Sequence, residues 1–235
     1  MTRRRVWAAC LVVLLLVTAS VLAYPRLRNA TAAEPLALEA VQPSGAGGPP
    51  PVGTWRVENG LVGYRITEPG NVTVVGRTES VTGGLVVNDA ATTSGDNAAA
   101  ADLMLTSVDV TADLGQLRSD AAGRDSALRT RILETDEFSQ ASFSLTSPVD
   151  LPAVTAGVPV AMQATGEFDI RDRRQPVDVE LTARWDGQQL RVVGSIPILL
   201  SDYAVDVPTV AGVDTIDDAA LVELDLTLSP STPQR

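Results

Sequence analysis

Residue types that carry chemistry in most enzymes are scarce in this chain of 235 residues. It contains no histidine, and its one cysteine, Cys10, lies in an apolar run near the N-terminus. The absence of histidine excludes histidine-based acid–base catalysis, Ser-His and Cys-His nucleophile pairs, and the commonest ligand of zinc and iron. A single cysteine cannot build a disulfide framework within the chain, so stability must come from packing.

Carboxylates are the remaining candidates for chemistry. Asp206, Asp214, Asp217 and Asp218 lie in one segment, and calcium prefers carboxylate oxygens. Their spacing lacks the D-x-D-x-D-G order of a dedicated calcium loop. Paired carboxylates also serve glycoside hydrolases, but acidic residues are abundant throughout and no pair stands out. We therefore predict no catalytic residues, no metal site and no cofactor, in a protein that is not an enzyme.

Charge is distributed unevenly along the chain. All eighteen basic residues are arginines, against twenty-nine aspartates and glutamates, which gives a net charge of −11. Residues 1–28 hold five of the arginines and no acid, so the rest of the chain carries −16. Nucleic acid and anionic lipid surfaces repel a domain this acidic. We expect no nucleic-acid partner.

The N-terminus has the features of an anchoring or targeting segment. Arg3–Arg5 precede Val6–Ala23, eighteen uncharged residues, close to the ~20 that span a bilayer. Basic residues before the span favour a cytoplasmic N-terminus. Val21-Leu22-Ala23 resembles a cleavage site, so a removable signal is the alternative. We expect residues 1–24 to anchor the protein in the cell membrane by a single pass, with the following domain outside the cytoplasm, or secreted if the segment is cleaved.

Residues 25–52 have the composition of a linker. Their second half reads QPSGAGGPPPV and is rich in proline, glycine and small residues, which cannot build a core. We predict a disordered spacer that tethers the domain to the membrane.

Alternation of apolar and polar residues dominates the remainder. Every second residue is apolar in Val177–Trp185, and the same pattern returns in Val222–Leu228. A period of two places apolar side chains on one face of a strand. Strands of this kind form antiparallel sheets with one buried and one wet face, in a sandwich or a barrel.

Turn signals and one change of period divide this region. Asn59-Gly60 predicts a two-residue hairpin between Trp55–Glu58 and Leu61–Thr67, and Asp186-Gly187 predicts a second hairpin. Ser119–Thr135 changes to a helical period. We predict nine or ten strands and one helix in a single all-β domain over residues 53–229, with a short tail at 230–235.

Four ordered fragments carry a resemblance to a known family. The chain resembles the YceI-like family, the lipocalin-like bacterial polyisoprenoid-binding proteins, over about residues 53–228. Two loop positions depart from the family pattern: Gln140 stands where proline is usual, and Asp172-Arg173-Arg174 replace Gly-Thr. The matching fragments are Gly53-Thr54-Trp55-Arg56-Val57; Asp125, Leu128, Ile132-Leu133 and Phe138 before Ala141-Ser142-Phe143; Gly166-Glu167-Phe168-Asp169-Ile170 before Gln175-Pro176-Val177; and Ser201-Asp202-Tyr203-Ala204-Val205 before Pro208 and Gly212.

The resemblance implies an eight-stranded antiparallel lipocalin-like barrel with one inserted α-helix. It also implies a long apolar ligand in the lumen, such as an isoprenoid quinone, a polyprenyl chain or an acyl lipid. A barrel of eight strands either is filled by its own side chains or holds one small ligand. Both outcomes are consistent with the small apolar residues of the alternating strands.

Strand parity gives candidate ligand-binding residues on the inner face. At the mouth, Arg65 or Arg77 is a candidate for contact with a polar head group. The alternative function is a non-catalytic envelope interaction module with a filled barrel, which would present loops such as Asn88–Ala98 or Ala204–Asp218 to a protein partner. The candidate lumen residues are Tyr64, Ile66, Phe143, Leu145, Met162, Phe168, Leu181, Trp185, Leu224 and Leu226.

Overall fold

The computed structural model describes residues 32–38, 48–68, 71–90, 103–151, 154–205 and 217–231. Within these ranges no helix is long and apolar enough to cross a membrane. The predicted anchor at residues 1–24 lies outside them, as do most of the two loops proposed as interaction surfaces.

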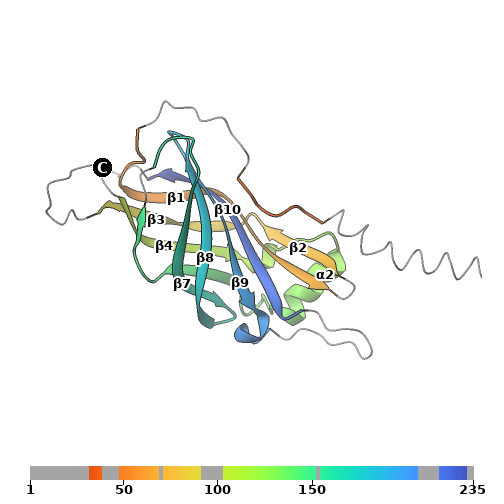
Figure 1. Ribbon diagram of the computed structural model, residues 1–235. Helices are drawn as coiled ribbons and strands as arrows, with labels where there is room; N and C mark the ends of the chain where they lie inside the picture. The colour runs from red at the N-terminus through yellow and green to blue at the C-terminus, as the bar shows by residue number, and fades with distance from the viewer. Residues whose placement is uncertain are drawn as a thin grey trace, which may run out of the picture.

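Ten strands form one antiparallel sheet that closes on itself (Figure 1). Closure comes from β10, which pairs with both β9 and β1. Eight strands make the ring in the order β1-β3-β4-β5-β7-β8-β9-β10, while β2 pairs with β1 and β6 with β4. The strands are β1 Gly53–Glu68, β2 Val72–Thr78, β3 Val81–Asp89, β4 Leu103–Asp113, β5 Gln140–Leu145, β6 Val149–Leu151, β7 Val160–Ile170, β8 Arg173–Trp185, β9 Leu190–Leu199 and β10 Ala219–Pro230.

The helical elements lie between strands at one end of the barrel. The α-helix α2 (Ala122–Ala127) continues into a π-helical turn, η2 (Leu128–Ile132), and the 3-10 turns η1 (Leu114–Gln116) and η3 (Leu200–Tyr203) lie in other connections. The buried Asp125 carboxylate accepts hydrogen bonds from the Ser119 backbone N–H at 2.9 Å and from the Ser119 hydroxyl at 2.6 Å.

The strand order and the position of α2 confirm the eight-stranded barrel with one short helical insertion that the resemblance predicts.

The predicted hairpin at Asn59-Gly60 is wrong. These residues lie inside β1, which runs unbroken for 16 residues and pairs with β10 on both sides of the dipeptide. A register shift between Val57 and Asn59 marks a β-bulge there. Continuous pairing with one long partner thus overrides a local turn signal. The second predicted hairpin is confirmed, because Asp186–Gln189 joins β8 to β9 and Trp185 pairs with Leu190.

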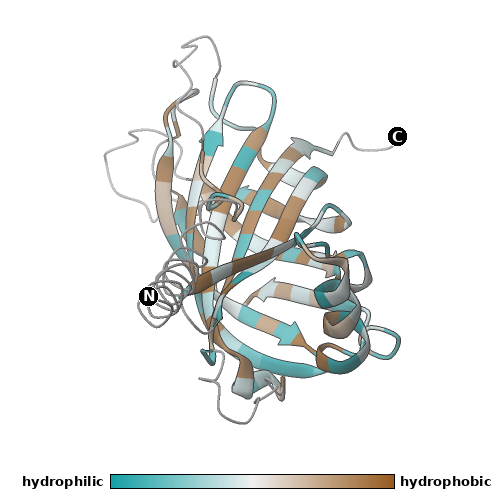
Figure 2. Cartoon of the chain, turned by 90° about the vertical axis from the view of Figure 1, so that its right-hand side faces the viewer, coloured by the Kyte–Doolittle hydropathy of each residue, from teal (hydrophilic) through white to brown (hydrophobic). Residues whose placement is uncertain are grey.

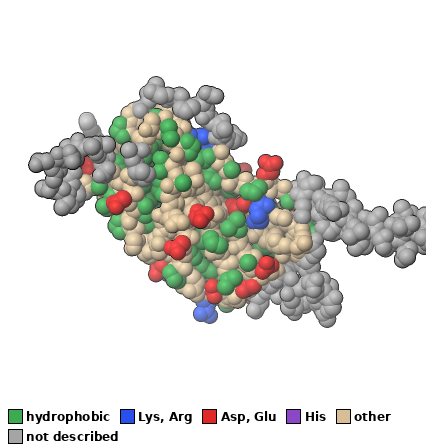
Figure 3. All heavy atoms as spheres, viewed as in Figure 1, with side chains coloured by type: hydrophobic (Ala, Val, Ile, Leu, Met, Phe, Trp, Pro, Cys, Tyr) green, Lys and Arg blue, Asp and Glu red, His purple; other side chains and the backbone are tan. Residues whose placement is uncertain are grey.

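Apolar and polar residues alternate along the strands, as the hydropathy colouring shows (Figure 2). Their side chains therefore point in turn to the inside and the outside of the barrel. On β10, Val222 and Leu226 are buried among the core residues of the lumen, while Asp225 pairs with Arg191 on the outer face. Acidic side chains dot the visible outer surface, with few arginines among them (Figure 3). This distribution agrees with the predicted acidic exterior and apolar interior.

The linker prediction needs correction at its C-terminal end. Pro50 is buried and lines the lumen, although the composition of residues 25–52 predicts a spacer outside the core. The indole N–H of Trp185 donates to the Gly48 carbonyl at 2.8 Å, and that of Trp55 donates to the Pro51 carbonyl at 3.2 Å. Two buried tryptophans therefore recruit a segment that has no core-forming pattern of its own.

The close packing around Gly60, inside β1, provides a test of the continuous strand. A β-carbon added at Gly60 would lie 2.8 Å from Val81 Cβ and 2.9 Å from Leu226 Cδ2. We expect Gly60→Ala to lower the free energy of unfolding by about 1–3 kcal/mol through overpacking. Gly123→Ala, in α2, meets no atom within 4 Å and is expected to be neutral or to stabilise by up to about 1 kcal/mol. Urea unfolding of both variants measures the difference, and equal effects would contradict the close packing at Gly60.

Candidate functional site

The barrel lumen contains two adjoining cavities, each of about 120 Å³. The tryptophan chamber lies at the end closed by Trp55 and Trp185, whose rings meet edge to face with centroids 5.4 Å apart. The helix chamber lies at the other end, beside residues of η1 and η2. The two chambers share the wall residues Val62, Ala112, Ala141, Phe168 and Val222.

The lining of both chambers is apolar. Among the described residues that line them, none carries a charge, and polar side chains are limited to Ser142 in the tryptophan chamber and Tyr64 and Thr78 in the helix chamber. Among its described lining residues, such a lumen offers hydroxyl groups but no carboxylate or guanidinium. It is suited to hydrocarbon, since burial of apolar surface needs no partner charge.

Nine of the ten candidate residues line a chamber, and whether they contact a ligand remains a prediction. Leu145 lines neither chamber and packs, partly buried, against the core cluster that contains both tryptophans. Phe168 lines both chambers, and its ring meets Tyr203 edge to face at 5.9 Å. Those in the tryptophan chamber are Phe143, Met162, Phe168, Leu181, Trp185, Leu224 and Leu226, and those in the helix chamber are Tyr64, Ile66 and Phe168.

Strand parity missed part of the lining. Val62 lies one alternation before Tyr64 on β1, so the same pattern would have found it. The cap of the helix chamber comes instead from irregular segments, where no alternation exists to read. Its members are Leu114, Leu117, Leu128, Ile132, Leu133, Leu200 and Val205.

The suggested head-group role of Arg65 and Arg77 is not supported by their position. Both side chains lie on the outer wall and pair with Glu223, at 3.0 Å from Arg65 and 3.3 Å from Arg77. Arg65 follows Tyr64, whose side chain lines the helix chamber, so alternation along β1 directs the arginine outward.

Three large inward side chains lie over glycines of a neighbouring strand. A β-carbon added at Gly76 would lie 2.4 Å from the Tyr64 ring, one at Gly166 would lie 2.3 Å from the Phe143 ring, and one at Gly194 would lie 2.5 Å from Leu181. Because each glycine lacks a side chain, the large side chain on the neighbouring strand can lie flat against the barrel wall. The free space of the lumen therefore depends on residues that have no side chain of their own.

Among the described residues, Tyr64 carries the one phenol that lines a chamber. Burial is the largest cause that raises its pKa from 10.0 to about 12, while Arg124 lowers the pKa and Asp125 raises it. The hydroxyl is therefore neutral at physiological pH, which keeps the helix chamber free of charge.

The acidic segment near residue 218 shows local hydrogen bonding. Asp218 accepts from the Ser201 backbone N–H at 2.9 Å and from its hydroxyl at 2.6 Å, and Asp217 accepts from the Ala219 N–H at 3.2 Å. Asp206 and Asp214 lie outside the described residues. Within the described ranges, no three acidic or cysteine side chains come together in a group that could hold a metal ion.

Comparison with known proteins places this barrel among related ones. The sequence profile of the YceI-like domain family matches residues 56–228. A polyisoprenoid binding domain from Saccharophagus degradans, implicated in plant cell wall breakdown, has a similar fold, with a TM-score of 0.58 and 16% identity. That match covers 75% of this chain and 98% of the other. None of the curated proteins compared with the sequence matches it.

A second solved structure has the same fold. Burkholderia cenocepacia BcnA matches with a TM-score of 0.53 and 16% identity, over 72% of this chain and 95% of its own. At such identities the two structures establish a common fold.

A double-mutant cycle tests the glycine-backed wall. The three atoms nearest to a β-carbon at Gly76 all belong to Tyr64, so we expect Gly76→Ala to cost about 1–3 kcal/mol by displacing that ring. In a Tyr64→Leu background the same change should cost much less. Gly166→Ala, which faces Phe143, should stay costly in both backgrounds. Urea unfolding gives the coupling energy, and a coupling near zero would contradict the contact.

Phenol titration tests the environment of Tyr64. The pKa of Tyr203 is also raised to about 12, chiefly by burial and then by Asp202 and Asp169. Because both folded-state values lie above 10.0, the stability contributed by the neutral phenols is complete below about pH 10 and is lost as the pH rises through about 12. We expect Tyr64→Phe to remove one phenol from the ultraviolet transition near pH 12. Loss of a phenol that ionises near pH 10 would contradict this.

Proposed function

The chain belongs to the YceI-like domain family, and we propose that its barrel binds an apolar lipid chain and catalyses no reaction. The observation that carries the proposal is the pair of adjoining chambers whose described lining holds no charged side chain. The proposed ligand classes are an isoprenoid quinone, a polyprenyl chain and an acyl lipid. The similarity of this fold to that of a polyisoprenoid binding domain supports this choice.

Chamber size constrains how a long chain would fit. Each chamber measures about 120 Å³, and an apolar cavity of roughly 150 Å³ accepts benzene. Each therefore suits a group of about the size of one isoprene unit. A longer chain would occupy both chambers and pass the Phe168 side chain, which lines each of them. We propose that the Phe168 ring moves aside when such a chain binds.

Energetics favour this mode of binding. Transfer of hydrocarbon from water yields roughly 0.8 kcal/mol for each buried CH₂, so about ten carbons offer roughly 8 kcal/mol before the cost of association is subtracted. The lumen needs no charged anchor for an affinity of this order.

The cellular setting is part of the proposal. The basic residues before the uncharged segment Val6–Ala23 support export with a membrane anchor, or with a cleaved signal. In either case the barrel would sequester or carry a lipid outside the cytoplasm. A filled barrel that acts as an interaction module is the competing function, and it predicts no bound lipid.

Native mass spectrometry with lipid extraction tests the binding function. We expect residues 32–235, purified without detergent, to carry a stoichiometric isoprenoid or acyl species. Met162→Asp places a charge in the tryptophan chamber and should reduce the bound lipid at least about tenfold, because an unpaired charge in an apolar site costs several kcal/mol. Leu181→Asp should reduce the bound lipid to a similar extent.

The control is Gln163→Asp, which adds the same charge to the exposed neighbour of Met162 on β7. It should retain the lipid. A mass without ligand that is unchanged by added quinones and polyprenols would overturn the proposal in favour of the interaction module.

A further inference from the structure

Residues 32–38 lie against the outer wall of the barrel and form a strap (Figure 1). Pro35–Leu38 line a groove together with outward residues of β7, β8, β9 and β10. Leu36 and Leu38 are partly buried, while Glu34, Pro35 and Ala37 are exposed. Contact across four strands is not the behaviour predicted for a free spacer.

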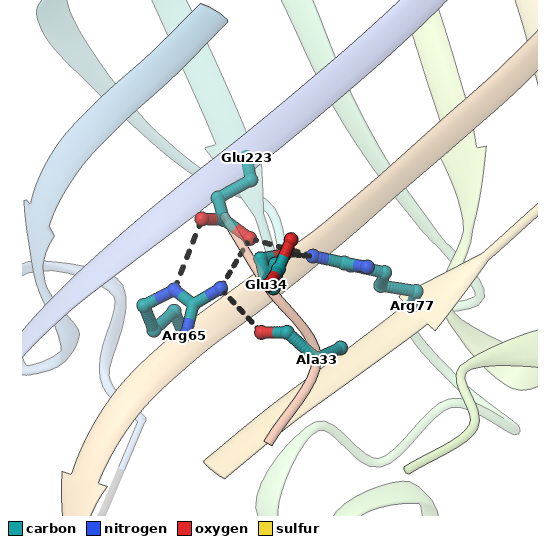
Figure 4. Close-up of polar contacts among 5 residues, drawn as sticks. All are labelled: Ala33, Glu34, Arg65, Arg77 and Glu223. Carbon is teal, nitrogen blue, oxygen red and sulfur yellow. Dashed lines mark hydrogen bonds and ion pairs between the residues drawn. The ribbon is translucent and has the colours of Figure 1, made fainter. Parts of the chain in front are cut away.

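An ionic cluster around a buried carboxylate lies under the N-terminal part of the strap (Figure 4). Glu223 points outward from β10, yet its residue is only 3% exposed. Its carboxylate accepts from Arg65 Nε at 3.0 Å and from Arg77 Nη2 at 3.3 Å. The same arginines reach the strap, because Arg65 Nη2 donates to the Ala33 carbonyl at 2.9 Å and Arg77 Nη2 donates to the Glu34 carbonyl.

The strap and the cluster depend on one another. One carboxylate does not satisfy all the donors of two guanidinium groups, and backbone carbonyls of the strap accept two of the remaining N–H groups. Val193 is also covered on the outer wall: it lines the groove together with strap residues and is only 7% exposed. A buried carboxylate is costly unless paired and hydrogen-bonded. The geometry is therefore that of a built site for an extended backbone.

The path of the chain is fixed at two places. Ala33 and Glu34 are held over β1 and β2 by Arg65 and Arg77, and Gly48 is held at the opposite end by the Trp185 indole. The N-terminal end of the strap thus lies on the side of β2, where α2 also lies (Figure 1).

We propose that this strap sets both the side and the distance at which the barrel is held from its N-terminal attachment. The proposal rests on the proposed membrane attachment. A free spacer over the twenty-eight residues 25–52 would reach up to about 100 Å, whereas the seven residues 25–31 reach at most about 25 Å. Docking of the strap keeps the helix end of the barrel close to the bilayer.

The test uses the full chain in nanodiscs of neutral lipid, with Cys10→Ser and a spin label on the exposed Ala37→Cys. We expect an immobilised label in this background. Glu223→Gln removes the buried charge and should abolish the immobile component. Leu36→Asp should do the same without changing any barrel residue, so it decides the question if Glu223→Gln fails to fold. Asp225→Asn is the matched control, because it breaks the Arg191 pair two residues away on β10 and should leave the label immobile.

A second measurement tests the distance between the barrel and the bilayer. Energy transfer from a dye on Gln188→Cys, again with Cys10→Ser, to a labelled lipid should fall when Leu36→Asp releases the strap. Docking of the strap would be overturned by any of three results. The label could be mobile in the unaltered strap, or immobile in both release variants. It could also be as mobile in Asp225→Asn as in the release variants. Unchanged transfer after release would overturn its control of distance. Elution of the chain apart from the discs would overturn the membrane attachment alone, since label mobility still reports docking.

Discussion

Pairing between the first and last strands is the constraint on which this structure depends. β1 pairs with β10 from Trp55 to Ile66, and this ladder joins the two ends of the sheet. Closure pairs each of the eight ring strands on both sides and gives each of them one inner and one outer face. Because the ladder must run the length of the barrel, β1 cannot turn at Asn59-Gly60, and the dipeptide instead pairs with Leu226 and Thr227 of β10 directly after the bulge.

Closure also decides what the wall can do. Inside, apolar residues meet across a space whose width is set by glycines on neighbouring strands, so that Tyr64, Phe143 and Leu181 lie along the wall. Outside, the same alternation gathers Arg65, Arg77 and Glu223 from three strands. The lumen and the strap site are thus two faces of the same register, and a slip of one residue would exchange them.

Much of this arrangement was predictable from local pattern. Val177–Trp185 and Val222–Leu228 alternate so strictly that strand identity and inner face follow directly, and Met162, Leu181 and Leu224 were placed by parity alone. Parity says nothing about Leu128 or Ile132, which reach the lumen from helical turns. It also says nothing about Pro50 or Leu36, whose positions depend in part on contacts with Trp185 and with arginines that are distant in sequence. Local signals also failed at Asn59-Gly60, where long-range pairing decides the conformation.

The two tryptophans at the closed end give the barrel an optical property. Trp55 is 1% exposed and Trp185 is 4% exposed, and both line the tryptophan chamber. The third tryptophan of the chain, Trp7, precedes the barrel in the sequence. Indole emission responds to the polarity and quenching groups around the ring, so the intrinsic fluorescence of this pair reports directly on what fills the chamber. A redox-active quinone and a saturated chain would leave different emission signatures without any added label.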